Sequence, residues 1–216
     1  MTGMRKLIIF DMDGLMFDTE SVAARAYMEV GGAKGLPVSM DKYRRVIGLD
    51  AKAIWARYRE DFGEAVDPRQ LYREVGARIG EITRTEGLPV KPGLFALLNV
   101  LEERGIPKVV ASGSDLPVIR SNLEHAGILD RFAMIISSDA FTHGKPSPDI
   151  FLACCEKMGV SPKDALVLED APSGIQAAIA GGIPVVAVPD ILEIPPSLAE
   201  QCLAIAADLT EVISCL

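Results

Sequence analysis

The sequence predicts an α/β fold built on a parallel sheet, and three observations support this prediction. Short, continuous apolar runs recur along the chain, segments with apolar residues at i, i+3 and i+4 lie between them, and one long stretch contains helical patterns alone. Short continuous runs are typical of strands buried on both faces. Strands that alternate with helices form parallel sheets with helices on both faces. We therefore expect a Rossmann-like, doubly wound sheet of five core strands with an inserted helical cap.

Each element follows from one of these patterns. The five expected strands are LIIF (7–10), KVVAS (108–112), MIISSD (134–139), ALVLED (165–170) and PVVAVP (184–189). The four expected helices between them span 93–104, 115–126, 147–159 and 172–180. Residues 18–91 show helical patterns throughout, so we expect the cap over this range and the core in residues 1–17 and 92–216.

Composition and charge exclude several classes of protein. The 216 residues include 22 basic and 30 acidic side chains, a net charge of −8, which argues against a general nucleic-acid binder. No apolar run approaches the ~20 residues that span a bilayer. The opening MTGMRKLIIF has an apolar run of only four residues, which does not fit a secretory signal. We therefore expect a cytoplasmic protein without nucleic-acid or membrane partners, and we expect it to be a monomer.

The acidity is unevenly distributed between the expected core and the expected cap. Residues 19–91 contain 13 Lys or Arg and 11 Asp or Glu, a net charge of +2, which leaves −10 for the rest of the chain. The four cysteines include no Cys-x-x-Cys pair, and the two histidines lie far apart in the sequence. A site built on histidine or cysteine ligands is therefore not expected.

The most informative motif is Asp11-Met12-Asp13-Gly14, directly after the first expected strand. Parallel α/β sheets bind ligands beyond the carboxyl ends of their strands. Two carboxylates at i and i+2 in such a turn offer the oxygen ligands that Mg²⁺ prefers. A pair of ordinary turn carboxylates would have the same pattern, so this motif alone leaves both interpretations open.

The other expected strand ends favour the metal interpretation. Ser112 ends the second strand and Gly113 follows it, and they offer a hydroxyl and backbone N–H groups to anionic oxygens. Lys145 lies in GKPSPD, just before an expected helix, and Glu169-Asp170 end the fourth strand. Clustered carboxylates repel one another unless a cation or a proton lies among them. A site for a metal ion and a phosphate group accounts for all of these residues.

With these motifs the chain resembles the haloacid dehalogenase superfamily, in its branch of phosphatases and β-phosphoglucomutase-like enzymes with a helical cap. The matching pieces are DMDGLMFDTE (11–20), the strand-end Ser112, Lys145 in GKPSPDIF, and LVLEDAPSGIQAA (166–178). They occur in the family's order and bracket the chain up to about residue 190. The resemblance implies that the core is the catalytic domain and that the helical insert is its cap.

The resemblance also implies roles for these residues. Asp11 would attack phosphorus and form an aspartyl-phosphate, and Asp13 would act as general acid and then as general base. Ser112, Gly113 and Lys145 would bind the phosphoryl oxygens. The metal ligands that it implies for Mg²⁺ are Asp11, Asp13 through its backbone carbonyl, Glu169 and Asp170. Beside Mg²⁺ and Lys145, Asp11 would have a depressed pKa.

Departures from the family patterns select among its reactions. Dehalogenases and phosphonoacetaldehyde hydrolases lack the second aspartate of the DxD motif, which is present here as Asp13. β-Phosphoglucomutases carry a His and an Arg at the positions of Ala23 and Ala51, and a Lys at the position of Asp115. Three missing sugar-phosphate contacts favour hydrolysis over mutase activity.

These inferences lead to one expected function and two alternatives. We expect a Mg²⁺-dependent phosphatase that hydrolyses a small phosphate monoester, with sugar phosphates as candidate substrates, through an aspartyl-phosphate intermediate. The alternatives are a β-phosphoglucomutase-like phosphomutase and a phosphate-binding regulator without turnover. In the cap, the segment at Gly48 resembles the family's substrate loop, and we expect Arg44 or Arg45 to contact a second anionic group of the substrate.

Overall fold

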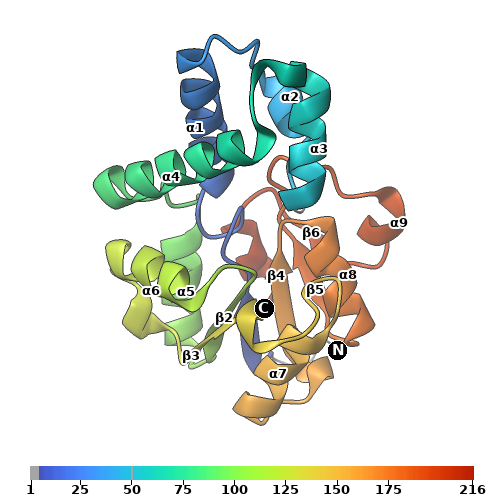
Figure 1. The fold of residues 1–216 in the computed structure, drawn as a ribbon. Coiled ribbons are helices and arrows are strands. Elements are labelled where there is room, and N and C mark those ends of the chain that lie inside the picture. Colours follow the sequence, from blue (N-terminus) through green and yellow to red (C-terminus); the bar gives the residue numbers. More distant parts are fainter. Residues whose placement is uncertain (1–4, 50) are drawn as a thin grey trace. The chain divides into compact units, whose positions relative to one another are not determined.

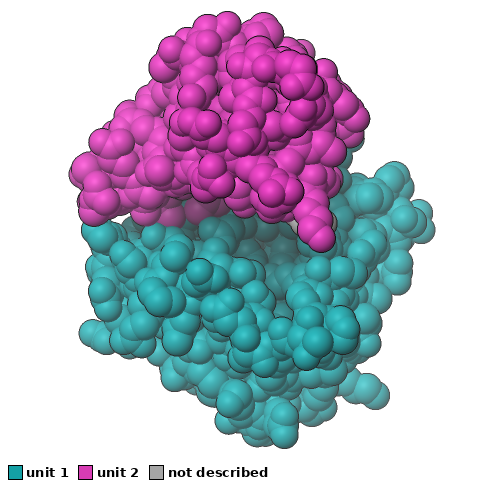
Figure 2. All heavy atoms as spheres, viewed as in Figure 1, with its two compact units in different colours: residues 1–18, 89–216 teal, residues 19–88 magenta. Residues whose placement is uncertain are grey.

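The computed structural model describes residues 5–49 and 51–216, so residues 1–4, the start of the segment compared above with a secretory signal, lie outside the described residues. The chain forms two compact units, which Figure 2 shows in different colours. Residues 1–18 and 89–216 form the first, here called the core unit, and residues 19–88 form the second, here called the helical unit. The helical unit is an insertion that follows the first strand.

The core unit is built on one parallel sheet with the order β3-β2-β1-β4-β5-β6 (Figure 1). Its strands are β1 (Leu7–Phe10), β2 (Lys108–Ser112), β3 (Met134–Ser137), β4 (Ala165–Glu169), β5 (Val185–Ala187) and β6 (Ala204–Ile205). The first five confirm the expected strands, with the ends of β3, β4 and β5 one to two residues shorter than their apolar runs. The doubly wound α/β fold is therefore confirmed.

Burial on both faces explains why the central strands are continuously apolar. All residues of β1, β2, β4 and β5 are buried. Alternate residues point to opposite faces of a strand, so Leu7 and Ile9 belong to one cluster with the residues of α7 (Asp149–Met158) and α8 (Pro172–Ala180). Phe10 belongs to the opposite face, where its ring meets that of Phe132 edge-on.

The helices of the core unit follow the predicted alternation. The remaining ones are α5 (Leu94–Glu103), α6 (Leu116–His125) and the short α9 (Pro196–Ala199). Single 3-10 turns complete the unit: η2 (Leu129–Arg131), η3 (Ser138–Ala140), η4 (Pro162–Asp164) and η5 (Glu211–Cys215). Because each crossover returns the chain to the same edge of the sheet, the polar residues that follow β1, β2 and β4 lie at one edge.

The sixth strand, β6, is an addition to the predicted sheet. It has only two residues, and it pairs with β5 through Val186 opposite Ala204 and Ala187 opposite Ile205. Neither residue of β6 is buried, since Ile205 keeps 47% of its surface exposed. A two-residue edge strand with little buried surface leaves no apolar run that a sequence pattern could reveal.

The helical unit consists of α1 (Thr19–Ala33), α2 (Met40–Arg44), α3 (Ala51–Phe62), a 3-10 turn η1 (Gly63–Ala65) and α4 (Pro68–Glu86). Ser39 and Asp67 cap the starts of α2 and α4 by accepting backbone N–H bonds, and Pro68 occupies the first turn of α4. Among the described residues, no helix of either unit is both long enough and apolar enough to cross a bilayer.

An aromatic cluster forms the core of the helical unit. The ring of Tyr27 lies 5.6 Å from that of Tyr43 and 5.9 Å from that of Tyr58, measured between centroids. Phe62 extends the cluster at 6.1 Å from Tyr58. The ring of Trp55 lies edge-on to that of Tyr72 at 6.3 Å. Burial of the rings of Tyr27, Tyr43, Tyr58 and Phe62 supplies the unit with its own hydrophobic core.

Candidate active site

The turn after β1 places Asp11 beside the end of β4. The backbone N–H of Asp11 donates to the carbonyl of Leu168 at 3.1 Å, so pairing with β4 continues one residue beyond β1. The turn is then closed by the N–H of Gly14, which donates to the carbonyl of Phe17 at 3.0 Å. Gly14 has a φ of +81°, a conformation that residues with a Cβ rarely adopt. This turn fixes where Asp11 and Asp13 project from the sheet edge.

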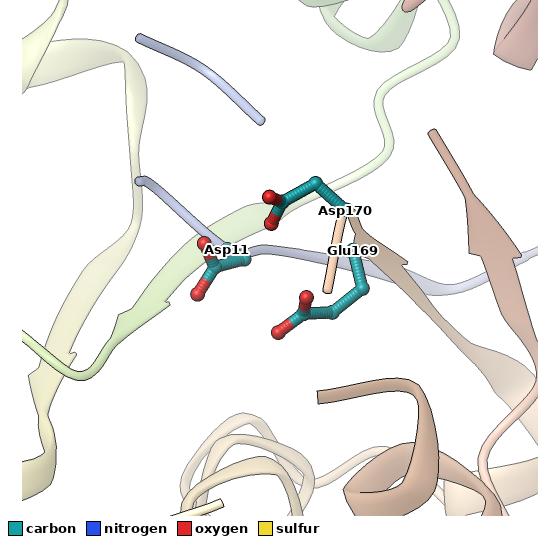
Figure 3. A group of neighbouring side chains, drawn as sticks. All are labelled: Asp11, Glu169 and Asp170. Carbon is teal, nitrogen blue, oxygen red and sulfur yellow. The ribbon is translucent and has the colours of Figure 1, made fainter. Parts of the chain in front are cut away.

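Three carboxylates meet at this edge. Asp11 follows β1, Glu169 ends β4 and Asp170 follows it, and Figure 3 shows their side chains gathered together. One oxygen from each lies within 4.8 Å of the other two. Asp11 is 6% exposed and Glu169 is 1% exposed, so water screens their charges poorly. The predicted acidic residues of the two strand ends are therefore neighbours.

Lys145 supplies a positive charge to two of these carboxylates. Its Nζ donates to Oδ1 of Asp11 in a short contact and to Oε1 of Glu169 at 2.6 Å. The side chain is 13% exposed, and its Nζ lies 4.9 Å from the centre of the Phe151 ring. The loop between β3 and α7 thus inserts one cation into an otherwise acidic group.

Asp13 points to a different set of partners from Asp11. Its Oδ2 accepts a hydrogen bond from Oγ of Ser112 at 3.1 Å and another from Oγ of Ser114 at 2.8 Å. Ser112 is fully buried at the end of β2, and its Oγ also accepts the N–H of Ser114 at 3.0 Å. Two hydroxyls from one loop therefore hold the carboxylate of Asp13 on the side of β2.

The loop after β2 is itself anchored to the end of β3. Oγ of Ser137 donates to the carbonyl of Ser114 at 2.8 Å, and Oγ of Ser138 donates to the carbonyl of Gly113 at 2.9 Å. Both bonds use carbonyl oxygens of the loop, and neither uses the N–H of Gly113. The structure thus places Ser112 and Gly113 next to Asp13, and their predicted contact with phosphate stays a prediction.

Burial dominates the electrostatics of the carboxylates. It raises the pKa of Asp11 above the usual range, although the charge of Lys145 acts in the opposite direction. It also raises the pKa of Asp170 to about 9, with further contributions from the negative charges of Glu169 and Asp11. Burial likewise raises the pKa of Asp13, and the hydrogen bonds from Ser114 and Ser112 offset part of that rise. All three shifts have the direction expected of carboxylates removed from water.

The expected depression of the Asp11 pKa therefore depends on a second cation. Burial alone would lower the pKa of Lys145, but the charges of Asp11 and Glu169 and the hydrogen bonds to both raise it, so the lysine stays charged. With Lys145 as the nearby cation, burial still outweighs its effect on Asp11. A divalent ion among the carboxylates would reverse the balance.

The donor set fits such an ion. Three carboxylates at one sheet edge are hard oxygen ligands of the kind that Mg²⁺ binds. Two glycines make room for them: a Cβ on Gly14 would lie 2.2 Å from Oδ2 of Asp170, and one on Gly174 would lie 1.7 Å from Oε1 of Glu169. The predicted ligands Asp11, Glu169 and Asp170 can therefore hold a divalent cation, whereas the carboxylate of Asp13 contacts the serines instead.

Sequence reasoning missed two contributors to this site. Gly174 lies in the first turn of α8 and admits the side chain of Glu169, and its place in the segment DAPSGIQ gave no sign of that approach. Ser114 contacts Asp13 as closely as Ser112 does. Its position two residues after a strand end was a usable signal, because alternate residues of an extended segment point the same way.

The candidate substrate residues of the helical unit are Arg44, Arg45 and Gly48, and the structure shows their contacts within that unit. Arg44 pairs with Asp41 at 3.1 Å, and Arg45 pairs with Asp61 at 2.7 Å. Gly48 has a φ of +73° and lines a cavity within the helical unit. The structure thus gives both arginines intramolecular carboxylate partners, and their predicted contact with an anionic substrate group stays a prediction.

Comparison with a family model agrees with this geometry. The model of haloacid dehalogenase-like hydrolases matches residues 5–182, which is most of the chain. The matched range contains Asp11, Asp13, Ser112, Lys145 and Asp170.

Individual proteins with similar sequences support the same family, and a solved structure shares the fold. Fructose-1-phosphate phosphatase YqaB of Escherichia coli (strain K12) is 34% identical over 84% of this chain and 95% of its own length. Hexitol phosphatase A of the same organism is 30% identical, covering 85% of this chain and 82% of its own. A β-phosphoglucomutase from Clostridium difficile superposes with a TM-score of 0.72 at 22% identity, covering 97% and 93% of the two chains, which is a likeness of fold.

Proposed function

The chain belongs to the haloacid dehalogenase-like hydrolases and is a phosphoric monoester hydrolase, and we propose that it removes phosphate from a small phosphorylated sugar or sugar alcohol through an aspartyl-phosphate. One observation carries this proposal. Asp11, held by Lys145 next to two further carboxylates, lies across the sheet edge from Asp13, which two serine hydroxyls hold in place. The two aspartates thus have different partners, as a nucleophile and a proton carrier require.

In the first step a carboxylate oxygen of Asp11 attacks phosphorus. An O–P bond forms to Asp11 while the bond from phosphorus to the ester oxygen breaks. The Nζ of Lys145 holds the carboxyl group of Asp11 through Oδ1 and offsets negative charge as the phosphoryl group approaches. In our proposal the N–H of Gly113 donates to a phosphoryl oxygen, and the hydroxyl of Ser112, which donates to Asp13 in the structure, turns to the phosphoryl group when it is bound.

Asp13 moves the protons of both steps. Its raised pKa favours the protonated carboxyl group, which can give its proton to the leaving ester oxygen and so release a neutral alcohol. The resulting carboxylate then takes a proton from the water that attacks the aspartyl-phosphate. That attack breaks the bond between phosphorus and Asp11, releases inorganic phosphate and restores both aspartates.

Asp11, Glu169 and Asp170, with the backbone carbonyl of Asp13, are the residues we propose as ligands of Mg²⁺. When bound, Mg²⁺ would neutralise negative charge on the phosphoryl group that is transferred. Lys145 cannot supply this alone, because burial keeps the pKa of Asp11 raised in spite of the lysine. The raised pKa values of Asp11 and Asp170, which lie next to the carboxylate of Glu169, therefore favour an enzyme that depends on a cation.

Hydrolysis is favoured over the phosphomutase alternative by three residues of this chain. Ala23 and Ala51 stand where mutases carry His and Arg, and Asp115 stands where they carry Lys. These side chains bring no positive charge or imidazole to hold a phosphosugar for a second transfer. The regulator without turnover is not retained, because the chain is a hydrolase that keeps the reactive groups of Asp11, Asp13 and Lys145.

Release of phosphate from fructose 1-phosphate and glucitol 6-phosphate tests the proposal. We expect turnover with Mg²⁺, none in EDTA, and recovery when Mg²⁺ is added in excess. In samples quenched with acid during turnover, peptide mass spectrometry should find a phosphoryl group on Asp11. The variant Asp11→Asn should fold, as circular dichroism would show, and should neither turn over nor carry the phosphoryl group.

Two results would contradict the proposal in different ways. Retention of most activity by Asp11→Asn would exclude the covalent mechanism. Conversion of glucose 1-phosphate into glucose 6-phosphate without release of inorganic phosphate would identify a mutase instead.

A further inference from the structure

The ion pair between Lys91 and Asp190 lies within the core unit and has no part in the mechanism described above. Nζ of Lys91 donates to Oδ1 of Asp190 at 2.6 Å, and the two side chains are 21% and 13% exposed. Asp190 lies in the loop after β5, and β5 pairs with β4, which ends at Glu169. The pair is therefore at the same edge of the sheet as the carboxylates of the candidate active site.

Lys91 belongs to the residues by which the chain re-enters the core unit, here called the return segment (residues 89–91). This segment pairs with the chain that leads out of the active-site turn. The N–H of Lys91 donates to the carbonyl of Met16 at 2.9 Å, and Phe17 forms an antiparallel bridge with Val90. The return segment is thus a short extended stretch against the end of that turn.

The same end of the turn fixes the backbone of Asp13. Met16 and Phe17 donate their N–H groups to the carbonyl of Met12 at 2.9 and 3.2 Å. The N–H of Gly14 donates to the carbonyl of Phe17 at 3.0 Å, and Asp13 itself forms a bridge with Phe17. A shift of Met16 and Phe17 is therefore transmitted to the backbone from which the carboxyl group of Asp13 projects.

Asp190 depends on Lys91 for its pairing. Its Oδ2 is buried and has no hydrogen-bond partner among the described residues, so its contact with Lys91 is made by Oδ1. A carboxylate that loses its cation while it is enclosed by protein is costly to keep there. Without Lys91, the loop after β5 would turn this carboxylate toward water, and the return segment would lose its side-chain contact with that loop.

The chain after the return segment is held independently of this pair. The N–H of Leu209 donates to the carbonyl of Pro92 at 3.3 Å. Gly93 approaches Thr210 so closely that a Cβ on the glycine would lie 2.3 Å from the backbone nitrogen of Thr210. Substitution of Lys91 should therefore loosen the return segment and leave the rest of the core unit folded.

We propose that Lys91 is a positioning residue for Asp13. Its pairing with Asp190 holds the return segment against the active-site turn and so keeps the carboxyl group of Asp13 directed at the ester oxygen. This inference rests on the proposed function, in which Asp13 protonates the leaving group, and deepens it. Proton transfer needs hydrogen-bond distance between acid and leaving oxygen, so a small displacement of the turn slows that transfer.

The dependence of kcat/KM on the leaving group tests this role. kcat/KM covers the steps up to release of the alcohol, in which Asp13 acts as acid, whereas p-nitrophenolate leaves without a proton. For Lys91→Met we expect kcat/KM to fall ~10-fold on glucitol 6-phosphate and less than ~3-fold on p-nitrophenyl phosphate. Lys91→Arg keeps a cation within reach of Asp190 and should restore most of the loss.

Arg131→Met is the matched control. Arg131 pairs with Glu102 at 2.7 Å, and its side chain is 21% exposed, as is that of Lys91. It lies just before β3, so it is at the opposite edge of the parallel sheet from Asp13. This variant also loses a partly buried ion pair, but it should keep the wild-type ratio of kcat/KM between the two esters.

A double-mutant cycle tests whether Lys91 acts through Asp190. Asp190→Asn should reproduce the selective loss on glucitol 6-phosphate. The double variant Lys91→Met/Asp190→Asn should lose no more than the more damaging single variant, because both substitutions break the same contact. Losses that multiply in the double variant would overturn the action through Asp190.

Hydrogen exchange gives a readout that does not need turnover. The N–H groups of Gly14, Met16 and Phe17 are bonded to carbonyls within the turn. In Lys91→Met, the peptide that spans residues 12–18 should exchange its amide hydrogens ~10-fold faster, as measured by mass spectrometry. Arg131→Met should leave the exchange of this peptide unchanged.

The outcomes distinguish a failure of this inference from a failure of the proposed function. No phosphate release from either ester by the wild type would overturn the function, and unchanged exchange of residues 12–18 in Lys91→Met would overturn the anchoring of the turn. Phosphate release with equal losses on both esters in Lys91→Met would leave the function standing and overturn the positioning role. If Lys91→Met fails to fold, Lys91→Gln and Asp190→Asn give the same comparison.

Discussion

Replacement of Lys145 by methionine should destabilise the core unit as well as stop turnover. The Nζ of Lys145 contacts Asp11 and, at 2.6 Å, Glu169, and the side chains of these carboxylates are only 9% and 2% exposed. Methionine fills a similar volume without the charge. The two carboxylates would then remain buried next to Asp170 without a cation, so the folded state would lose stability.

The size of this loss follows from the burial of the pair. Removing one partner of a buried ion pair costs about 3–5 kcal/mol because the other charge stays buried without compensation. For a chain of this length, each kcal/mol corresponds to a shift of about 2–4 °C in Tm. We therefore expect Tm of Lys145→Met in EDTA to be roughly 6–20 °C below that of the wild type. Saturating Mg²⁺ should recover part of the difference, since the ion replaces the missing charge.

Thermal unfolding followed by circular dichroism at pH 7.5 measures the shift. Lys6→Met is the matched control, because Lys6 pairs with Asp164 at 2.8 Å while their side chains remain 65% and 41% exposed. An exposed pair contributes about 0–1 kcal/mol, so the control should stay within about 4 °C of the wild type. Equal Tm values for Lys145→Met and Lys6→Met would refute the claim that the lysine compensates buried charge.

Three further predictions concern Asp170, Gly14 and Ser114 at the candidate active site. Burial raises the pKa of Asp170 to about 9. Between about pH 4 and pH 9 the folded state therefore binds more protons than the unfolded state, so folding loses stability as the pH rises. We expect Tm in EDTA to fall from pH 6 to pH 8. Saturating Mg²⁺ should reduce that slope, and a Tm that rises with pH in EDTA would contradict the assignment. Gly14→Ala should raise the Mg²⁺ concentration needed for half-maximal phosphate release, because its Cβ would lie 2.2 Å from Oδ2 of Asp170; Gly105→Ala, also at positive φ but with open space around it, should not. Ser114→Ala should lower kcat about 10-fold on alkyl phosphates and less on p-nitrophenyl phosphate, whose leaving group needs no proton from Asp13; equal losses on both would argue against this positioning role.

The sheet and the core of the site could be predicted because each depends on local patterns. Burial on both faces makes a strand such as β1 continuously apolar, and this marks its end at Phe10. The next residue is then Asp11, so a carboxylate at the sheet edge can be read directly from the sequence. The same reasoning places Ser112 at the end of β2 and Glu169 at the end of β4. Parallel connectivity brings these ends to one edge, so sequence distance does not obscure the site.

Features that depend on side-chain direction were not accessible in this way. The partners of Arg44 and Arg45 depend on the rotation of α2 and on where Asp61 lies along α3. Periodicity gives the helices but not which charged faces meet, so the pairing of these arginines with carboxylates was not visible in the sequence, and their contact with substrate stays a prediction. The approach of Glu169 to Gly174 was equally hidden, since a glycine in the first turn of a helix can have several causes.

The ion pairs of the helical unit explain why the net charge of a segment does not indicate where an anion binds. Residues 19–91 have a net charge of +2, yet most cations of the helical unit are neutralised by carboxylates of the same unit. An anion is attracted by the local, uncompensated charge and not by the sum. In the acidic core unit that charge would come from the divalent ion that the carboxylates can hold, because Lys145 is already paired with Asp11 and Glu169. Substrate recognition should therefore respond to the removal of that ion far more than to any change in net charge of the same size elsewhere.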